Sequence, residues 1–188
     1  MPVHLSWVII PAMIGSHETD ESQASALCKA CGLCCTGHLF IWVKLRPREL
    51  DPAEALGMTV FRSDPTQRGF SQPCPLWKGD CTIHASAHYP RACLAYQCKL
   101  LKEVIAEKTA LPTALDIIQQ ARGLIRELEP LLPDLPNPNF RERLVTRIEH
   151  PQRFAELSDS EAEFQRKAGD LLAFYARVFG VNDLLEKM

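Results

Sequence analysis

The sequence predicts an α+β fold that is mainly α, with a small cysteine-rich module of short strands and loops packed against a carboxy-terminal helical bundle. Two observations carry this prediction. All eight cysteines lie in the 71 residues from Cys28 to Cys98. Residues 99–188 contain no cysteine and repeat apolar side chains at helical spacings of three and four. The chain therefore divides into three predicted parts: a leader expected to be poorly ordered (1–22), the cysteine module (23–105) and the helical region packing on it (106–188).

The first residues of the chain indicate the cellular compartment of the protein. Residues 5–14 have the length of a signal-peptide core, but no Lys or Arg precedes them, Pro11 interrupts them and no small-x-small cleavage site follows. The segment is also too short to span a bilayer. We therefore expect a cytoplasmic protein without a membrane partner, in which cysteines stay reduced and can serve as metal ligands.

The charge distribution argues against a nucleic-acid partner. The formal net charge is −2, with 8 Lys/Arg against 8 Asp/Glu in residues 1–98 and 13 against 15 in residues 99–188. A nucleic-acid binder needs clustered cations to displace counterions from phosphates, and neither part of this chain supplies a basic stripe. We expect no nucleic-acid partner.

The cysteine module has strand and turn signals between its cysteines. Residues 38–45 are rich in β-branched and aromatic side chains and predict a strand. Pro47 suits the first turn of a short helix that ends near Leu56, and residues 62–72 have the composition of a polar loop. Residues 74–83 predict a hairpin around Lys78-Gly79-Asp80, with Cys74 and Cys81 facing each other.

Helical periodicity begins at Cys93 and continues to the end of the chain. Pro112 is expected to open a helix that closes at Pro130, residues 132–139 to form a connection, and residues 140–150 to form another helix. Ser160 and Glu163 form a capping-box pattern for a long final helix that Gly180 stops. The predicted apolar faces of the three main helices are Leu94, Cys98, Leu101 and Ile105; Leu115, Ile118, Ala121 or Arg122, Ile125 and Leu128; and Phe164, Ala168, Leu171, Leu172, Tyr175, Val178 and Phe179.

Four cysteines within eight residues indicate metal binding. Cys28, Cys31 and Cys34 repeat a two-residue spacing, which lets a tight turn bring sulfurs to one ion about 2.3 Å away, as tetrahedral zinc requires. Three thiolates at this spacing also hold iron–sulfur clusters, with a fourth ligand from elsewhere. Disulfides suit this cluster poorly without a secretory signal. The expected cofactor is therefore a 4Fe-4S cluster or zinc.

The adjacent pair Cys34-Cys35 departs from the ferredoxin pattern and restricts how the ligands are shared. Neighbouring α-carbons are about 3.8 Å apart and their side chains diverge in an extended chain, so both sulfurs rarely reach one ion. The eight cysteines could form two four-coordinate sites, one cluster plus a structural site, or one site with additional thiols nearby. The sequence leaves these arrangements open.

Other polar residues lie close to the cysteines in sequence. His84 and His88 are four apart, which on a helix would place both on one face, but no Glu follows His84 to complete a metalloprotease motif. A packed neutral histidine is commoner than a ligand in this setting. Lys29, Arg91 and Lys99 are placed to offset the negative charge of a thiolate site, and solvated surface charge explains them equally well.

The cysteine pattern resembles a known family. CxxCxxCC at Cys28 to Cys35 is followed by a Cys-Pro, a Cys-x-Ile-His, a Pro-x-x-Cys and a last Cys five residues on. This arrangement, over about residues 25–105, resembles the YkgJ-type cysteine-cluster family, described as a zinc- or iron-chelating domain related to the flagellin lysine N-methylases. The resemblance implies that the chelating set is Cys28, Cys31, Cys34, Cys35, Cys74, Cys81, Cys93 and Cys98.

Two classes of function follow from the sequence. The first is a metal- or cluster-binding protein. The second is a metal-dependent enzyme that resembles flagellin lysine N-methylase and transfers a methyl group from S-adenosylmethionine. The chain lacks a glycine-rich phosphate loop, a nucleophile elbow and sustained βα alternation, which weighs against the enzyme. The first class is therefore the main prediction.

Overall fold

The computed structural model describes residues 22–84, 86–136, 139–153 and 158–187. Apart from Ser22, the predicted leader lies outside the described residues. The fold is α+β and mainly α, as the sequence predicts. No helix in the described part of the chain is both long enough and apolar enough to cross a bilayer.

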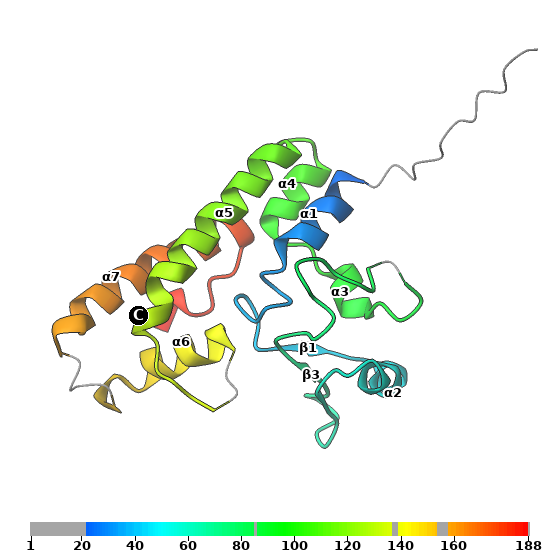
Figure 1. Ribbon diagram of the computed structural model, residues 1–188, viewed down its shortest axis with the longest axis horizontal. Coiled ribbons are helices and arrows are strands. Elements are labelled where there is room, and N and C mark those ends of the chain that lie inside the picture. Colours follow the sequence, from blue (N-terminus) through cyan, green and yellow to red (C-terminus); the bar gives the residue numbers. More distant parts are fainter. Residues whose placement is uncertain (1–21, 85, 137–138, 154–157, 188) are drawn as a thin grey trace, which may run out of the picture.

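The elements follow one another as Figure 1 shows. The first group contains α1 (Gln23–Cys31), β1 (Trp42–Lys44), α2 (Pro47–Ala55), β2 (Val60–Phe61), β3 (Gly69–Ser71), α3 (Arg91–Ala95) and α4 (Lys99–Ile105). The second contains α5 (Leu111–Leu128), the 3₁₀ turn η1 (Glu129–Leu131), α6 (Phe140–Glu149), α7 (Ser158–Phe174), the π-helical turn η3 (Tyr175–Phe179) and the 3₁₀ turn η4 (Leu185–Lys187).

A large core forms where α5 and α7 lie side by side and α1 and α4 cover one end of α5 (Figure 1). Each helix buries one apolar stripe. Most of the predicted stripe of α5 is confirmed, since Ile118, Ala121, Ile125 and Leu128 are buried. Leu115 is only partly buried, and the unpredicted Ala114 is buried instead. Leu27 of α1 and Leu100 and Val104 of α4 enter the same core.

The final helix buries the predicted face but starts earlier than predicted. Phe164, Ala168, Leu171, Leu172, Tyr175 and Phe179 are buried, and Val178 is partly buried. α7 already begins at Ser158, so Ser160 lies inside the helix rather than before it. At the other end, η3 continues α7 to Gly180, whose φ of 72° ends the helix as predicted.

A small antiparallel sheet in the order β1-β3-β2 lies with α2 at the other end of the molecule (Figure 1). Its side chains and those of α2 form a second core of Leu45, Leu50, Ala53, Met58 and Phe70. The predicted helix after Pro47 is confirmed, whereas the predicted strand over 38–45 is reduced to β1. The amides of His38 and Leu39 instead donate to the Leu33 carbonyl in the turn that follows α1. The predicted loop 62–72 contains β3.

The predicted continuous helix from Cys93 is wrong. α3 ends at Ala95, Tyr96 has an extended backbone (φ −76°, ψ 125°), and α4 starts again after Cys98. This break changes which side chains α4 buries. Leu100 and Val104 are buried, whereas Leu94 and Ile105 of the predicted stripe are 67% and 49% exposed.

The predicted hairpin at residues 74–83 is reduced to one bridge, and its predicted pairing is wrong. The bridge pairs Cys81 with Trp77, so Cys74 does not lie opposite Cys81. The turn itself lies where predicted, because the Lys78 amide donates to the Asp80 carbonyl and Gly79 has a φ of 89°.

Asn139 joins the sheet region to the helices. Its Oδ1 accepts the Glu142 amide at 2.8 Å and caps α6, while its Nδ2 donates to the carbonyls of Ile41 and Gln72, each at 3.3 Å. Asn139 is only 4% exposed, so water does not reach these partners to take the place of its side chain. The Cβ of Asn139 also leaves no space for a side chain at Gly37, where an added Cβ would lie 2.5 Å away.

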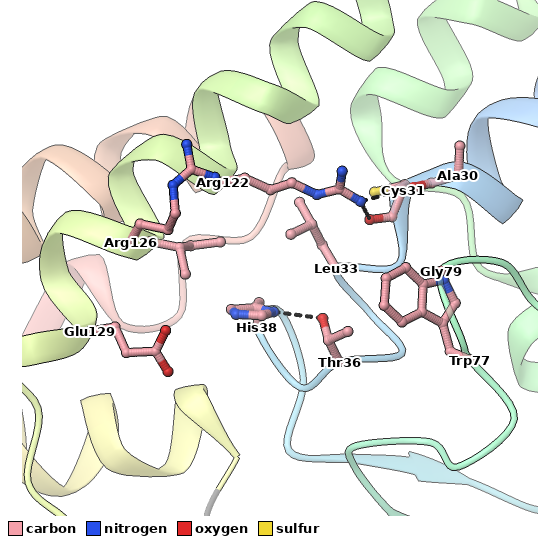
Figure 2. A pocket seen from close by; sticks show the side chains of 11 residues that line it. Ala30, Cys31, Leu33, Thr36, His38, Trp77, Gly79, Arg122, Arg126 and Glu129 are labelled. Atoms are coloured by element: carbon pink, nitrogen blue, oxygen red, sulfur yellow. Dashed lines mark hydrogen bonds between the residues drawn. The ribbon is translucent and has the colours of Figure 1, made fainter.

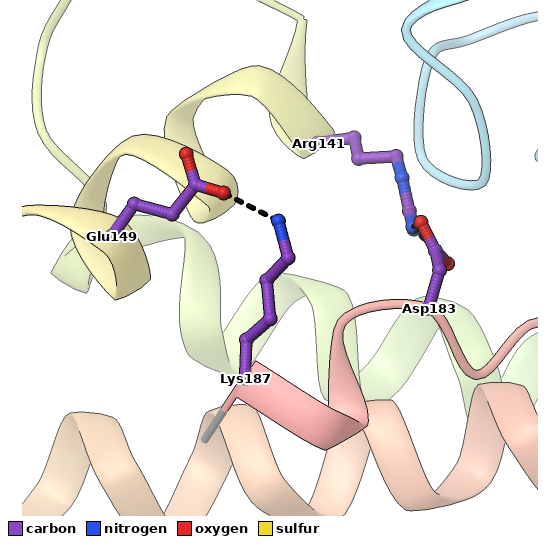
Figure 3. Close-up of polar contacts among 4 residues, drawn as sticks. All are labelled: Arg141, Glu149, Asp183 and Lys187. Atoms are coloured by element: carbon purple, nitrogen blue, oxygen red, sulfur yellow. Dashed lines mark hydrogen bonds and ion pairs between the residues drawn. The ribbon is translucent and has the colours of Figure 1, made fainter.

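Ion pairs tie the end of the chain to α6 (Figure 3). The buried Arg141 guanidinium donates to both carboxylate oxygens of Asp183 at 2.5 and 2.6 Å. The Lys187 ammonium donates to Glu149 at 2.5 Å. The first pair matters for the site described below, because it fixes Arg141 with its guanidinium almost wholly inside the molecule.

We expect Asn139→Ala to lower the free energy of unfolding by about 2 kcal/mol, because it removes a helix cap and leaves two buried carbonyls unpaired. Chemical denaturation measures the change. Asn182→Ala is the matched control, since Asn182 is exposed, and it should change stability by less than about 0.5 kcal/mol. Equal losses in the two variants would show that Asn139 does not join the two regions.

The His38 imidazole should make stability depend on pH. Burial and, to a smaller extent, the charge of Arg122 together lower the pKa of His38 to about 4. The unfolded chain therefore binds a proton at a higher pH than the folded chain does. The free energy of unfolding should fall by about 1 kcal/mol per pH unit as the pH drops from about 6.5 toward 4. Denaturation of His38→Gln should show a shallower fall, whereas the exposed His150→Gln should match the unsubstituted protein. Parallel pH profiles for all three would contradict this expectation.

Candidate metal centre

The end of α1 arranges the first four cysteines. Cys28 and Cys31 lie in its last turns, and Gly32 ends the helix with a φ of 62°. The amide of Thr36 then donates to the Gly32 carbonyl at 2.8 Å, which closes a turn containing Cys34 and Cys35. This turn folds the CxxCxxCC segment back beside the helix that carries its first half.

Trp77 covers this turn from the second cysteine region. An added Cβ at Gly32 would lie 2.2 Å from the Trp77 ring, so only glycine allows this approach. The Trp77 indole N–H donates to the Lys29 carbonyl at 3.4 Å. Nothing in the local sequence signals this contact, because Trp77 is 45 residues further along the chain.

The other four cysteines each come from a different setting. Cys74 lies in a turn, and its amide donates to the Cys35 carbonyl at 2.7 Å. Cys81 lies at the isolated bridge and Cys93 within α3. Cys98 is the N-cap of α4, where its thiol accepts the Leu101 amide at 3.4 Å. All eight thiols are free of disulfides and partly buried.

Five of the thiols meet around one small apolar cavity of about 60 Å³. They are Cys28, Cys31, Cys34, Cys35 and Cys98. A cavity needs only about 10–15 Å³ to hold one water molecule, so this one has room for a group of several atoms. The remaining walls are mostly aliphatic or aromatic and include Leu27, Leu39 and Ile118.

Four cysteines are grouped on the side of the helical core, and we call them the helix half: Cys28, Cys31, Cys34 and Cys98. Cys31, Cys34 and Cys98 pack against that core. Burial raises the pKa of Cys31 to about 12, with further increases from Cys98 and Cys28. Burial likewise raises the pKa of Cys28, and Cys98 is the first of the thiols that add to it.

The other four are grouped on the side of the sheet, and we call them the sheet half: Cys35, Cys74, Cys81 and Cys93. Cys74 packs against the core of the sheet and α2. Burial raises the pKa of Cys35, and the thiols of Cys74, Cys93 and Cys81 add to it in that order. Burial raises the pKa of Cys93 to about 12, again with increases from Cys74 and Cys81. Cys28 also raises the pKa values of Cys35 and Cys93, and Cys35 raises that of Cys34, so the two halves adjoin each other.

The chemistry of these donors fits a thiophilic metal or cluster. No group of three or more Cys, His, Asp or Glu in the described part of the chain is already arranged to hold a metal ion. Thiols with raised pKa values carry protons at neutral pH, so a bound cation must replace those protons and draw the sulfurs inward. Eight soft donors in two adjoining groups are suited to zinc or to an iron–sulfur cluster.

Two buried polar atoms beside the helix half also fit a negatively charged thiolate site. The Tyr175 hydroxyl and Nη1 of Arg141 have no hydrogen-bond partner within the described structure. Tyr175 is close enough to Cys31 and Cys34 for both thiols to raise its pKa after burial, the largest cause, and Arg141 acts in the opposite direction. A buried donor without a partner costs about 1–3 kcal/mol. Metal-bound thiolates in the helix half would supply the missing negative charge.

The cations expected from sequence neighbourhood have other surroundings. Lys29 forms an ion pair with Asp80 at 3.7 Å, and Arg91 and Lys99 are exposed. One nearby cation is Lys102, four residues after Cys98, which lowers the pKa of that thiol. Two others come from distant segments. Arg122 of α5 lowers the pKa of Cys31, and Arg141 of α6 lies near Tyr175. Both arginines lie about 90 residues or more after the CxxCxxCC motif, so local sequence patterns do not predict that they lie near it.

The two histidines lie in turns rather than on a helix, so they do not share a helical face. The His84 ring packs on Tyr89 with ring centres 5.1 Å apart and borders a surface pocket with Cys28 and Cys93. His88 is exposed. The packed histidine is thus His84, next to the sheet half.

Comparisons of the chain with models of protein families, with curated proteins and with solved structures give no match. The geometry of the cysteines is therefore the basis for assigning a function.

Proposed function

We propose that this protein binds a metal, either zinc or a 4Fe-4S cluster, through its eight cysteines. The observation that carries the proposal is the grouping of eight disulfide-free, partly buried thiols: five line one cavity, and the other three lie close enough to Cys35 to raise its pKa. Metal ligation explains these eight thiols better than a purely structural role does. Small apolar residues could fill the same space if packing were the only requirement. Free thiols also favour a reducing compartment, which we propose is the cytoplasm.

The centre is proposed to contain two four-cysteine sites. The helix half supplies Cys28, Cys31, Cys34 and Cys98, and the sheet half supplies Cys35, Cys74, Cys81 and Cys93. The division is supported by the packing of three thiols on the helical core and of Cys74 on the sheet core. It is also supported by the adjacent cysteines: after burial, Cys31 is the thiol that most raises the pKa of Cys34, and Cys74 is the thiol that most raises the pKa of Cys35.

Charge balance distinguishes the two halves. Arg122 and Arg141 lie on the side of the helix half, where a site with four thiolates would be negative. Tyr175 can donate a hydrogen bond to a sulfur there, which stabilises a cluster and raises its potential. Zinc would supply structural cross-linking, whereas an iron–sulfur cluster would supply electron transfer. The methyltransferase alternative stays a prediction of the family resemblance.

The direct test is metal and labile-sulfide analysis of protein purified without oxygen. Cys31→Ser should lose the metal of the helix half and keep that of the sheet half, and Cys81→Ser should do the reverse, because each change removes one of four ligands. Iron with sulfide identifies a cluster, and zinc without sulfide identifies a structural site.

Ala30→Ser is the matched control, because it adds a hydroxyl at an exposed position next to Cys31 and removes no thiol. It should retain all the metal. Full metal content in both cysteine variants would rule out the proposed ligands. If either single variant loses all the metal, the proposal of metal binding by the cysteines stands, but the division into two independent sites is wrong.

A further inference from the structure

A larger pocket opens next to Cys31 (Figure 2) and shares Cys31 and Leu33 with the small cavity. Its volume is about 480 Å³, within the range of about 300–1,000 Å³ common for small-molecule sites. One wall is formed by α5, and another by the turn after α1, with Trp77 at the edge. The pocket thus combines residues from regions that are far apart in the sequence.

Two arginines of α5 line this pocket one helical turn apart. Nη2 of Arg122 donates to the carbonyls of Ala30 and Cys31 at 3.0 and 3.1 Å, and its other nitrogens have no acceptor in the described residues. Arg126 has no hydrogen bond or ion pair with any described residue. The lining carboxylate, Glu129, is paired with Arg143 at 3.2 Å. The lining charges therefore favour an anion.

His38 provides a hydrogen-bond acceptor in the same pocket. The Thr36 hydroxyl donates its single proton to the Gly32 carbonyl at 2.8 Å. The 2.6 Å contact between that hydroxyl and Nδ1 of His38 therefore requires Nδ1 to carry the hydrogen. This tautomer leaves Nε2 with a free lone pair, and Figure 2 shows the ring nitrogen opposite Thr36 directed away from it. The ring is held in place by Phe140, with ring centres 4.9 Å apart.

Apolar surface completes the pocket. Leu33, Ile125 and the Trp77 ring contribute to its lining, and Leu33 and Ile125 are buried members of the helical core. A fully inorganic ion would leave this surface uncovered. A ligand with an apolar part as well as a charged group would fill more of the volume.

We propose that this pocket binds a small organic anion whose negative charge lies on a carboxylate or a phosphate group. Arg126 and the free edge of Arg122 hold the negative charge, and Trp77 and Leu33 contact the apolar part. Nε2 of His38 is available to accept a hydrogen bond where the ligand also carries a donor. The bound molecule lies beside Cys31, which lines the pocket. The site goes beyond metal binding and does not require it.

Benzoate and phenyl phosphate are suitable probes, because they share a ring and differ in the anionic group. Benzyl alcohol is the neutral probe of similar size. Each is titrated into ¹⁵N-labelled protein while the indole N–H signal of Trp77 is followed, after its assignment with Trp77→Phe. Saturable shifts are expected with at least one anion, and the tighter of the two identifies the preferred group. Benzyl alcohol should bind at least about tenfold more weakly, because it leaves the arginines unpaired.

Arg126 gives the decisive variant, because it is exposed and holds no other residue in place. Arg126→Gln should weaken anion binding about tenfold, whereas Arg126→Lys should retain most of it. Arg166→Gln removes the same charge from an exposed position on α7 outside the pocket, and it should leave binding unchanged. Binding that is equal for benzyl alcohol and the anions, or an absence of shifts at millimolar probe, would overturn the proposal. So would equal effects of Arg126→Gln and Arg166→Gln.

The titrations are made on protein as purified without oxygen, with its metal content measured in the same sample. Anion binding in a sample without metal would support this pocket and count against the metal proposal alone. Metal without anion binding would count against the pocket alone. The two proposals therefore fail separately.

Discussion

The left-handed turn at Gly32 is the constraint on which the cysteine arrangement depends. It ends α1 directly after Cys31 and lets Cys34 and Cys35 fold back beside the helix. The same glycine lets the Trp77 ring approach to a distance that no other residue permits, which brings the 74–81 segment against α1. One backbone conformation thus joins the two cysteine regions before any metal is considered.

The cysteines lie at the boundary between a large helical core and a small sheet core, and this position explains both their burial and their division. The sheet core has few apolar residues, and the 74–84 segment beside it has little regular structure. Asn139 supplies a direct polar connection across the boundary. A metal in the sheet half would cross-link the turn after α1, which carries Cys35, to the 74–81 segment and α3, so that its binding energy would also stabilise the fold where packing is weakest.

Much of this arrangement is predictable from local sequence, and the failures have physical causes. The stripes of α5 and α7 and the helix after Pro47 follow directly from periodicity and proline placement. The break at Tyr96–Cys98 was missed because Cys98 fits a helical stripe as well as an N-cap. The surroundings of the cysteines were missed for a different reason: Trp77, Arg122, Arg141 and Tyr175 reach them through tertiary contacts. Periodicity carries no information about such contacts.

The central claim is that sulfur atoms, and no other protein atoms, hold a metal in this protein. X-ray absorption at the metal edge of protein purified without oxygen tests it most directly, because it reports the type and distance of the ligand atoms. The account predicts a first coordination shell of sulfur alone, at about 2.3 Å for either zinc or an iron–sulfur cluster. A shell containing nitrogen or oxygen from the protein, such as the imidazole of His84, would contradict it.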